Sequence, residues 1–249
     1  MSHIAHFGNV DEIKKEKEKI TRNIKKGGVL VVNNDNEKSE EIIKNSRAAV
    51  ATFAIKTKAN FLGEEINFKT DSEFGTNFKL RHDGSSVPFF LKTSIGYPSI
   101  YASLAAAAVC FNLGFNLVEI SNSLISYHPP RGRMNIIKGI KSSIVIDDTY
   151  NSAPQSLGEA IKLLVEIKQN KTSILVLGDM LELGNYSAEA HKKIGKIILE
   201  SNINFLYTIG RESKKINEAV IEGGMNKDRA LHLSTHQEIV NDLEKRKSE

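Results

Sequence analysis

The sequence has no tryptophan, a single cysteine and no long apolar run among its 249 residues. The lone Cys110 permits no internal disulfide, and its apolar neighbours predict that it lies in the core. No stretch of about 18 consecutive apolar residues occurs, so no membrane-spanning helix is predicted. The first residues lack the basic and apolar segments of a secretory signal. We therefore expect a cytoplasmic protein in a reducing compartment.

A strong excess of one charge is also missing. The 34 basic and 30 acidic side chains leave a formal net charge of +4. The densest basic stretches, at 13–20 and 243–249, are interleaved with glutamate. Such stretches are typical of solvent-exposed helix faces, so we expect no nucleic-acid partner.

Several common catalytic motifs do not occur in the sequence. No G-x-G-x-x-G follows a predicted strand, which argues against a nicotinamide dehydrogenase. The G-x-x-x-x-G-K-[ST] phosphate loop, H-E-x-x-H, paired C-x-x-C and G-x-S-x-G motifs are missing too. The residues alone therefore indicate an α/β protein without one of these standard sites.

The second half of the chain alternates between strand and helix patterns. Strands are predicted at 143–147, 173–177, 205–209 and 230–233, and helices at 153–169, 186–201, 211–222 and 235–247. This alternation predicts a mainly parallel, Rossmann-like sheet covered by helices. Two prolines in "YHPPRGR" (127–133) interrupt the preceding helix, so we predict domains at 1–128 and 129–249.

The first half predicts a mixed α/β domain with an antiparallel ribbon. A charged helix pattern at 11–26 precedes a short buried strand that ends in Asn33, Asn34 and Asp35. Alternating strand patterns follow at 59–70, 75–82 and 86–92, and helix patterns at 98–112 and 117–127.

Polar side chains gather where the predicted strands of the second half end. Asp147 and Asp148 follow one strand, Asp179 the next and Arg211 the third. Because the carboxyl ends of parallel strands share one edge, these residues predict a polar crevice for a small anionic ligand. The alternative is that each acid only caps its own turn.

The helix that follows Asp148 carries a start signal of its own. Ser152 and Gln155 stand in capping-box register, with Pro154 in the first turn. The N–H groups of this helix start would face the same crevice.

The segments "IDDTYNSAP" (146–154) and "LVLGDMLELG" (175–184), followed by His191, resemble the C-terminal domain of the Mur ligases. The segments "SHIAHFG" (2–8), "VVNNDNE" (31–37) and "PPRGRM" (129–134) resemble parts of the central ATPase domain and the hinge of that family. The resemblance runs nearly end to end. It implies a partial central ATPase domain followed by a Rossmann-like ligase domain that lacks its last strand.

The resemblance is closest to the type that adds D-Ala-D-Ala to UDP-MurNAc-tripeptide in peptidoglycan synthesis. It implies an ATP-dependent peptide ligase that uses Mg²⁺ and works through an acyl phosphate. The UDP-MurNAc-peptide and D-Ala-D-Ala are the implied partners.

Site residues follow from the same resemblance. His3 would bind Mg²⁺, Lys17 would correspond to a lysine that some members carbamylate to hold a second metal, and Asn33 and Asp35 would lie near the nucleotide. Without the resemblance, Lys17 is simply one charge on a solvated helix face.

The segment around the hinge supplies the other implied residues. Arg133 would meet the ATP phosphates, and Asp148 would hold the ribose or orient the phosphates. Tyr150 and Asn151 would lie near the incoming D-Ala-D-Ala. Lys17, Arg133 and Asp148 form the implied catalytic set.

The sequence also departs from the family pattern. The family's UDP-sugar domain and phosphate loop have no counterpart here, and Pro98 and Ser99 stand where the family has the His and Asn that help hold adenine. We therefore expect a truncated ligase that is inactive alone. Two alternatives remain: one half of a split ligase with a separately encoded N-terminal piece, and a non-catalytic binding module.

Overall fold

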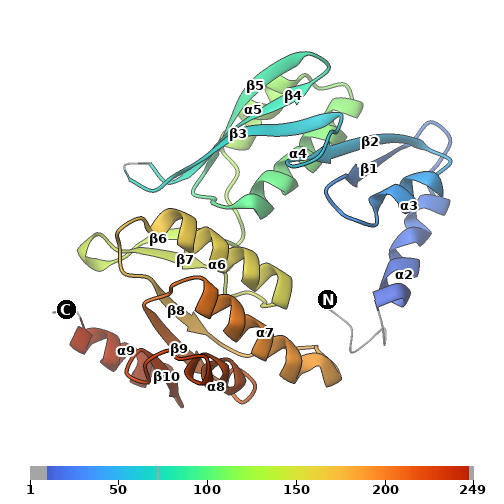
Figure 1. Ribbon diagram of the computed structural model, residues 1–249. Helices are drawn as coiled ribbons and strands as arrows, with labels where there is room; N and C mark the ends of the chain where they lie inside the picture. The colour runs from blue at the N-terminus through green and yellow to red at the C-terminus, as the bar shows by residue number, and fades with distance from the viewer. Residues whose placement is uncertain (1–9, 72, 247–249) are drawn as a thin grey trace. The chain divides into compact units, whose positions relative to one another are not determined.

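A computed structural model describes residues 10–71 and 73–246, which form two units (Figure 1). The first unit comprises Asp11–Asp148, and the second begins at Thr149. Each unit has its own sheet and its own core. The domain boundary at 128/129 stays a prediction. In the part of the chain that the structure describes, no helix combines the length and the apolar character needed to cross a membrane.

The first unit contains a five-stranded mixed sheet in the order β1-β2-β3-β4-β5. Its strands are β1 (Val29–Asn33), β2 (Ala49–Ala54), β3 (Phe61–Lys69), β4 (Gly75–His82) and β5 (Ser85–Lys92). The β1–β2 and β2–β3 pairs are parallel, and the β3–β4 and β4–β5 pairs are antiparallel, which confirms the predicted ribbon. Asp83 and Gly84 form the turn between β4 and β5 with φ of 46° and 77°, the left-handed geometry of a tight hairpin.

The helices of this unit are α2 (Val10–Arg22), α3 (Ser39–Lys44), α4 (Tyr97–Asn112) and α5 (Leu117–Ile125). The apolar helix α4 packs across β1, β2, β3 and β4 (Figure 1). Its Ile100 and Leu104 are fully buried against Phe61 and Leu80 of the sheet. Asn116 caps α5 in a capping box. Its side chain accepts the backbone N–H of Glu119 at 3.0 Å, and the Glu119 carboxylate accepts the backbone N–H of Asn116.

One predicted strand lies elsewhere than expected. The segment predicted as the first strand of the parallel sheet is β7 (Ile144–Asp147), and it pairs antiparallel with β6 (Asn135–Lys138). Lys141 and Ser142 adopt φ of 49° and 61° in the connecting turn η1 (Ile140–Ser142), which reverses the chain. The two strands form a separate two-stranded ribbon within the first unit, so the expectation that β7 joins the parallel sheet was wrong.

The second unit contains a parallel sheet in the order β10-β9-β8, covered by helices. Its elements are α6 (Pro154–Lys168), β8 (Ile174–Leu177), η2 (Gly184–Tyr186), α7 (Ser187–Glu200), β9 (Phe205–Ile209), α8 (Lys214–Glu222), β10 (Ala230–Leu233) and α9 (His236–Lys245). The alternating order confirms the predicted α/β fold class.

The N-terminal cap of helix α6 lies one residue later than predicted. Ala153 precedes the helix, and Ser156 Oγ accepts the Ala153 N–H at 3.2 Å and donates to the Ala153 carbonyl at 3.0 Å. Ser156, not Ser152 with Gln155, closes the first turn. The capping-box register predicted for Ser152 and Gln155 was therefore wrong.

The carboxylate of Asp35 connects three parts of the first unit. It follows β1 and accepts the backbone N–H groups of Ile55 at 2.6 Å, Lys56 at 3.0 Å and Thr57 at 2.8 Å, just beyond β2. The Tyr101 hydroxyl of α4 donates to it at 2.8 Å. Burial alone would raise the pKa of Asp35, but these hydrogen bonds hold that pKa below its ordinary value of 3.8.

We expect Asp35→Asn to lower the free energy of unfolding by about 2–3 kcal/mol, because a neutral amide replaces a charged acceptor of several hydrogen bonds. The lowered pKa makes this stabilisation fully present above the unfolded-state pKa and lost as the pH falls through the folded-state value. Urea unfolding at pH 7 and at a pH of about 3 measures both effects. The exposed Glu37 supplies the control, and an equal loss in Glu37→Gln would contradict this account.

Gly195 allows α7 and α8 to approach closely. A Cβ at this position would lie 2.7 Å from Ala219 Cβ and 3.2 Å from the Ile216 carbonyl oxygen. Gly158, in α6, is also buried, but a Cβ there would be 3.7 Å from Ile197 Cδ1, an ordinary contact.

Two glycine substitutions should therefore have opposite effects on thermal unfolding. Gly195→Ala should lower the free energy of unfolding by about 1–3 kcal/mol, because the two helices must separate. Gly158→Ala should leave it unchanged or raise it by up to about 1 kcal/mol, because alanine favours a helix interior. If Gly195→Ala left the free energy of unfolding unchanged, the contact between α7 and α8 would be looser than described.

Candidate functional site

A hollow of about 430 Å³ lies beyond the carboxyl end of β1. It is lined by Asn34, Asp35, Asn36, Glu37, Glu40 and Thr57. Three of these side chains are carboxylates and none is basic, so the hollow is unfavourable for a bare phosphate. It suits a group that donates hydrogen bonds.

The polar residues at this strand end also hold their own backbone. Asn33 Oδ1 accepts the Asp35 N–H at 3.0 Å, and Asn34 Nδ2 donates to the Lys58 carbonyl at 2.8 Å. With the Asp35 bonds to 55–57, these contacts connect the loops on either side of the hollow. The predicted nucleotide contacts of Asn33 and Asp35 stay predictions.

The two aspartates at the end of β7 hold the turn around Arg133. Asp147 Oδ2 accepts the Gly132 N–H and Asp148 Oδ1 accepts the Met134 N–H, each at 3.2 Å. Gly132 and Met134 have φ of 73° and 51°, so the carboxylates stabilise a left-handed conformation on both sides of Arg133. The structure thus brings Arg133, Asp147 and Asp148 into one turn.

Electrostatics distinguish Asp148 from an ordinary surface acid. Burial raises the pKa of the half-buried Asp148, and the adjacent charge of Asp147 raises it further. The Met134 N–H and the charge of Arg133 only partly offset this effect. The ionised carboxylate is therefore under-compensated, and a hydrogen-bond donor or a cation from a ligand would stabilise it.

The roles of the other predicted site residues stay predictions. Tyr150, with 70% of its surface exposed, and the exposed Asn151 lie in the second unit, ahead of α6. His3 lies outside the described residues, as does the side chain of Lys17 in α2. Within the ranges that the structure describes, no group of three or more His, Cys, Asp or Glu side chains could hold a metal. The Mg²⁺ site stays a prediction.

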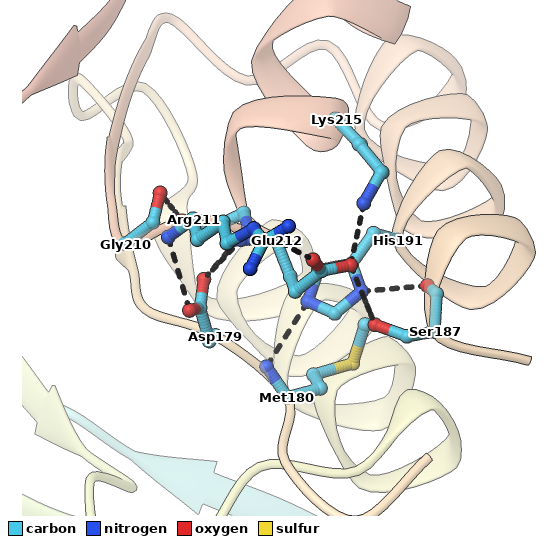
Figure 2. Close-up of polar contacts among 9 residues, drawn as sticks. Asp179, Met180, Ser187, His191, Gly210, Arg211, Glu212 and Lys215 are labelled. Carbon is cyan, nitrogen blue, oxygen red and sulfur yellow. Dashed lines mark hydrogen bonds and ion pairs between the residues drawn. The ribbon is translucent and has the colours of Figure 1, made fainter. Parts of the chain in front are cut away.

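At the carboxyl edge of the parallel sheet, Asp179 connects β8 to the segment after β9 (Figure 2). Its carboxylate accepts three consecutive backbone N–H groups, from Arg211 at 3.1 Å, Glu212 at 3.0 Å and Ser213 at 2.7 Å. The predicted meeting of Asp179 and Arg211 at one edge is confirmed. Asp147 and Asp148 follow a strand of the separate β6–β7 ribbon, so their predicted place on an edge of this parallel sheet was wrong. Asp179 itself serves as a turn cap, the simpler of the two interpretations, and it occupies the three backbone N–H groups just before α8.

His191 is the polar residue of this edge whose role the sequence did not reveal. It is fully buried in α7, its Nε2 accepts the Met180 N–H at 3.1 Å, and its Nδ1 lies 2.7 Å from the Ser187 carbonyl oxygen (Figure 2). These partners require the neutral tautomer with the proton on Nδ1. The Ser187–His191 spacing of four was readable from the sequence, but the bond to Met180 depends on the fold.

A second chain of contacts extends from the same helix turn. Ser187 Oγ donates to Glu212 Oε2 at 2.9 Å, and the Lys215 ammonium contacts that same oxygen (Figure 2). The Lys215 and Ser187 contacts hold the pKa of Glu212 below its ordinary value. Glu212 is therefore already occupied by partners from its own unit.

Comparison with protein-family models gives two matches. The model for the Mur ligase middle domain matches residues 1–110, and the model for the Mur ligase glutamate ligase domain matches residues 132–248. The two matches follow each other along the chain without overlap.

Individual relatives agree with these models. The chain is 33% identical over 223 residues to the UDP-N-acetylmuramoyl-tripeptide–D-alanyl-D-alanine ligase of Buchnera aphidicola subsp. Baizongia pistaciae, covering 89% of this chain and 47% of the relative. It is 27% identical over 240 residues to the ligase of the same name from Bacillus subtilis, covering 96% and 50%. The chain thus spans about half the length of the curated relatives it matches.

Solved structures show the same similarity. A crystal structure of MurF from Acinetobacter baumannii matches with a TM-score of 0.84 and 25% identity, covering 98% of this chain and 52% of that one. MurF ligase from Thermotoga maritima in complex with ADP matches with a TM-score of 0.75 at 18% identity, covering 98% and 58%, and shows the shared fold. With the two family models and these relatives, the chain belongs to the Mur ligase family, of which it carries the middle and C-terminal domains.

Proposed function

We propose that this chain forms the central and C-terminal part of an ATP-dependent ligase that adds D-Ala-D-Ala to UDP-MurNAc-tripeptide. The observation that carries the proposal is the continuous similarity to ligases of that named activity, across both matched domains. The domain boundary lies at 128/129 in this proposal, beside the two prolines of the hinge. The cytoplasm, where the chain would meet its soluble substrates, is the proposed location.

The proposed reaction has two steps. The tripeptide carboxylate first attacks the γ-phosphorus of ATP, which forms an acyl phosphate and releases ADP. The amine of D-Ala-D-Ala then attacks the acyl carbon, so a peptide bond forms and inorganic phosphate leaves. Such phosphoryl transfer depends mostly on positioning and charge neutralisation.

The residues of the first unit would bind the nucleotide in this proposal. The hollow beside Asn33 and Asp35, whose carboxylates can accept hydrogen bonds, would lie near the nucleoside. The exposed Arg133 would pair with phosphates, and Asp148 would accept a ribose hydroxyl or orient the phosphates. The geometry supports this assignment because one turn presents a cation and an under-compensated carboxylate together.

The remaining roles rest on the family resemblance. Tyr150 and Asn151 would contact D-Ala-D-Ala, and their exposure leaves them accessible to a ligand. His3 and Lys17 would hold Mg²⁺, which would neutralise phosphate charge when bound. Lys17, Arg133 and Asp148 remain the proposed catalytic set.

A second candidate function is a non-catalytic binding module. It is favoured by Pro98 and Ser99, which replace the family's adenine-binding His and Asn. Ser99 Oγ accepts a hydrogen bond from the buried Ser94 at 2.5 Å, so it is engaged at the start of α4. Weak nucleotide affinity would follow from these replacements.

We expect the 249-residue chain alone to release no phosphate from ATP in the presence of UDP-MurNAc-tripeptide and D-Ala-D-Ala, because its sequence contains no phosphate-binding loop. Adding a polypeptide that supplies the UDP-sugar domain and that loop should restore phosphate release. A coupled phosphate assay measures both conditions. Turnover by the chain alone would refute the claim of inactivity, and failure of the mixture would favour the binding module.

We expect Asp148→Asn to reduce the restored activity on the order of a hundredfold, through lost positioning of the nucleotide. The variant should fold normally, because the asparagine amide oxygen can still accept the Met134 N–H. Its stability at neutral pH should equal or slightly exceed that of the wild type. The reason is that a raised folded-state pKa stabilises the protein at low pH and this contribution is lost as the pH rises.

The matched control is Asp83→Asn in the β4–β5 turn. Asp83 is exposed, and asparagine tolerates its φ of 46°. Both activity and thermal stability of this control should match the wild type. Equal activity in Asp148→Asn and Asp83→Asn would show that Asp148 does not position the nucleotide.

A further inference from the structure

The segment 178–183 after β8, here named the β8 loop, presents one large apolar side chain to solvent. Leu181 has 67% of its surface exposed, whereas Met180 and Leu183 on either side are each only 2% exposed. Glu182 adopts a left-handed φ of 61°, which sets the backbone between Leu181 and Leu183. Leu181 is therefore held outward by two buried anchors.

The β8 loop is fixed by buried polar contacts as well as by packing. His191 accepts the Met180 N–H immediately before Leu181, and Asp179 binds the three N–H groups that follow β9 (Figure 2). Burying an imidazole is unfavourable unless its nitrogens are satisfied, and both nitrogens of His191 have backbone partners. The fold thus uses a buried hydrogen-bonded histidine to hold a short surface loop.

Arg211 follows β9 and contacts Asp179 of the β8 loop. Its backbone N–H is bound by Asp179, so its position relative to the β8 loop is set by a direct hydrogen bond. Its side chain is 94% exposed, and its Nε lies 3.9 Å from Glu212 Oε1, at the outer limit of an ion pair. Glu212 already contacts Lys215 and Ser187, so it neutralises Arg211 only weakly.

Together these residues place an apolar group and a guanidinium at the carboxyl edge of a parallel sheet, where ligands of open α/β folds bind. The backbone N–H groups of residues 211–213 cannot bind a ligand anion there, because Asp179 already occupies them. A ligand carboxylate at this edge would therefore pair with the Arg211 side chain.

We infer that Arg211 and Leu181 bind the acceptor dipeptide of the reaction, an inference that rests on the proposed function. The Arg211 guanidinium pairs with the C-terminal carboxylate of D-Ala-D-Ala through two hydrogen bonds. Leu181 contacts a methyl group of the dipeptide. This arrangement leaves the dipeptide amine free to attack the activated carboxyl.

Binding of the dipeptide to the 249-residue chain can be measured by NMR without ATP or the sugar nucleotide. The probes are D-Ala-D-Ala and its C-terminal amide, which keeps both methyl groups and lacks the carboxylate. D-Ala-D-Ala should shift the Leu181 methyl and Arg211 Nε–H resonances in a saturable way. The amide should bind about tenfold more weakly, because it loses the charge-assisted pair.

Two variants and two matched controls test the residues. Arg211→Gln should weaken D-Ala-D-Ala binding about tenfold, so that the variant no longer binds the dipeptide more tightly than its C-terminal amide. Leu181→Ser should weaken the binding of both ligands several-fold, and the variant should still bind the dipeptide more tightly than the amide. The controls are Arg229→Gln, an exposed arginine before the amino end of β10, and Val240→Ser, 46% exposed on α9. Both controls should bind both ligands as the wild type does.

Several outcomes overturn the inference. It falls if D-Ala-D-Ala produces no saturable shifts at Leu181 and Arg211, or if Arg211→Gln retains the preference for the free carboxylate. It also falls if ligation is restored by the complementing polypeptide and Arg211→Gln leaves the KM for D-Ala-D-Ala unchanged. That last result would leave the proposed function intact. Carboxylate-dependent binding at these residues without any restored ligation would instead reject the proposed function and retain the binding site.

Discussion

The structure depends on aspartate carboxylates that bind backbone N–H groups at the ends of strands. Asp35 does so after β1, Asp179 after β8, and Asp147 and Asp148 at the end of β7. In each case the donors lie in a different segment of the chain, so the carboxylate fixes a loop relative to its strand. Loops at the carboxyl ends of strands are the usual positions of ligands in α/β folds, and these bonds hold them in one conformation.

The carboxylates nevertheless differ in their capacity to bind a ligand. The pKa of Asp35 is lowered because its hydrogen bonds outweigh the effect of burial, which leaves it committed to structure. The pKa of Asp148 is raised because burial and Asp147 outweigh the Met134 N–H and Arg133. The ionised form of Asp148 therefore gains from a further donor, and it is the stronger candidate for contact with a ligand.

The sequence predicted the elements better than it predicted their partners. Periodicity located β9 and β10 at 205–209 and 230–233, because these strands have apolar side chains bounded by turn residues. It did not reveal that β7 pairs with the four-residue β6, since a short apolar run fits either a parallel or an antiparallel neighbour. It also left open whether Asp179 binds a ligand or caps a turn, because the N–H donors of Asp179 lie 32 to 34 residues away.

The central claim is that this chain completes an ATP-driven ligase working through an acyl phosphate. Transfer of oxygen from the substrate to phosphate tests it most directly. UDP-MurNAc-tripeptide labelled with ¹⁸O in its terminal carboxylate would be incubated with ATP, D-Ala-D-Ala, the chain and the complementing polypeptide, and the phosphate analysed by mass spectrometry. The account predicts one ¹⁸O atom in each phosphate released with product. Product formed with unlabelled phosphate would contradict it.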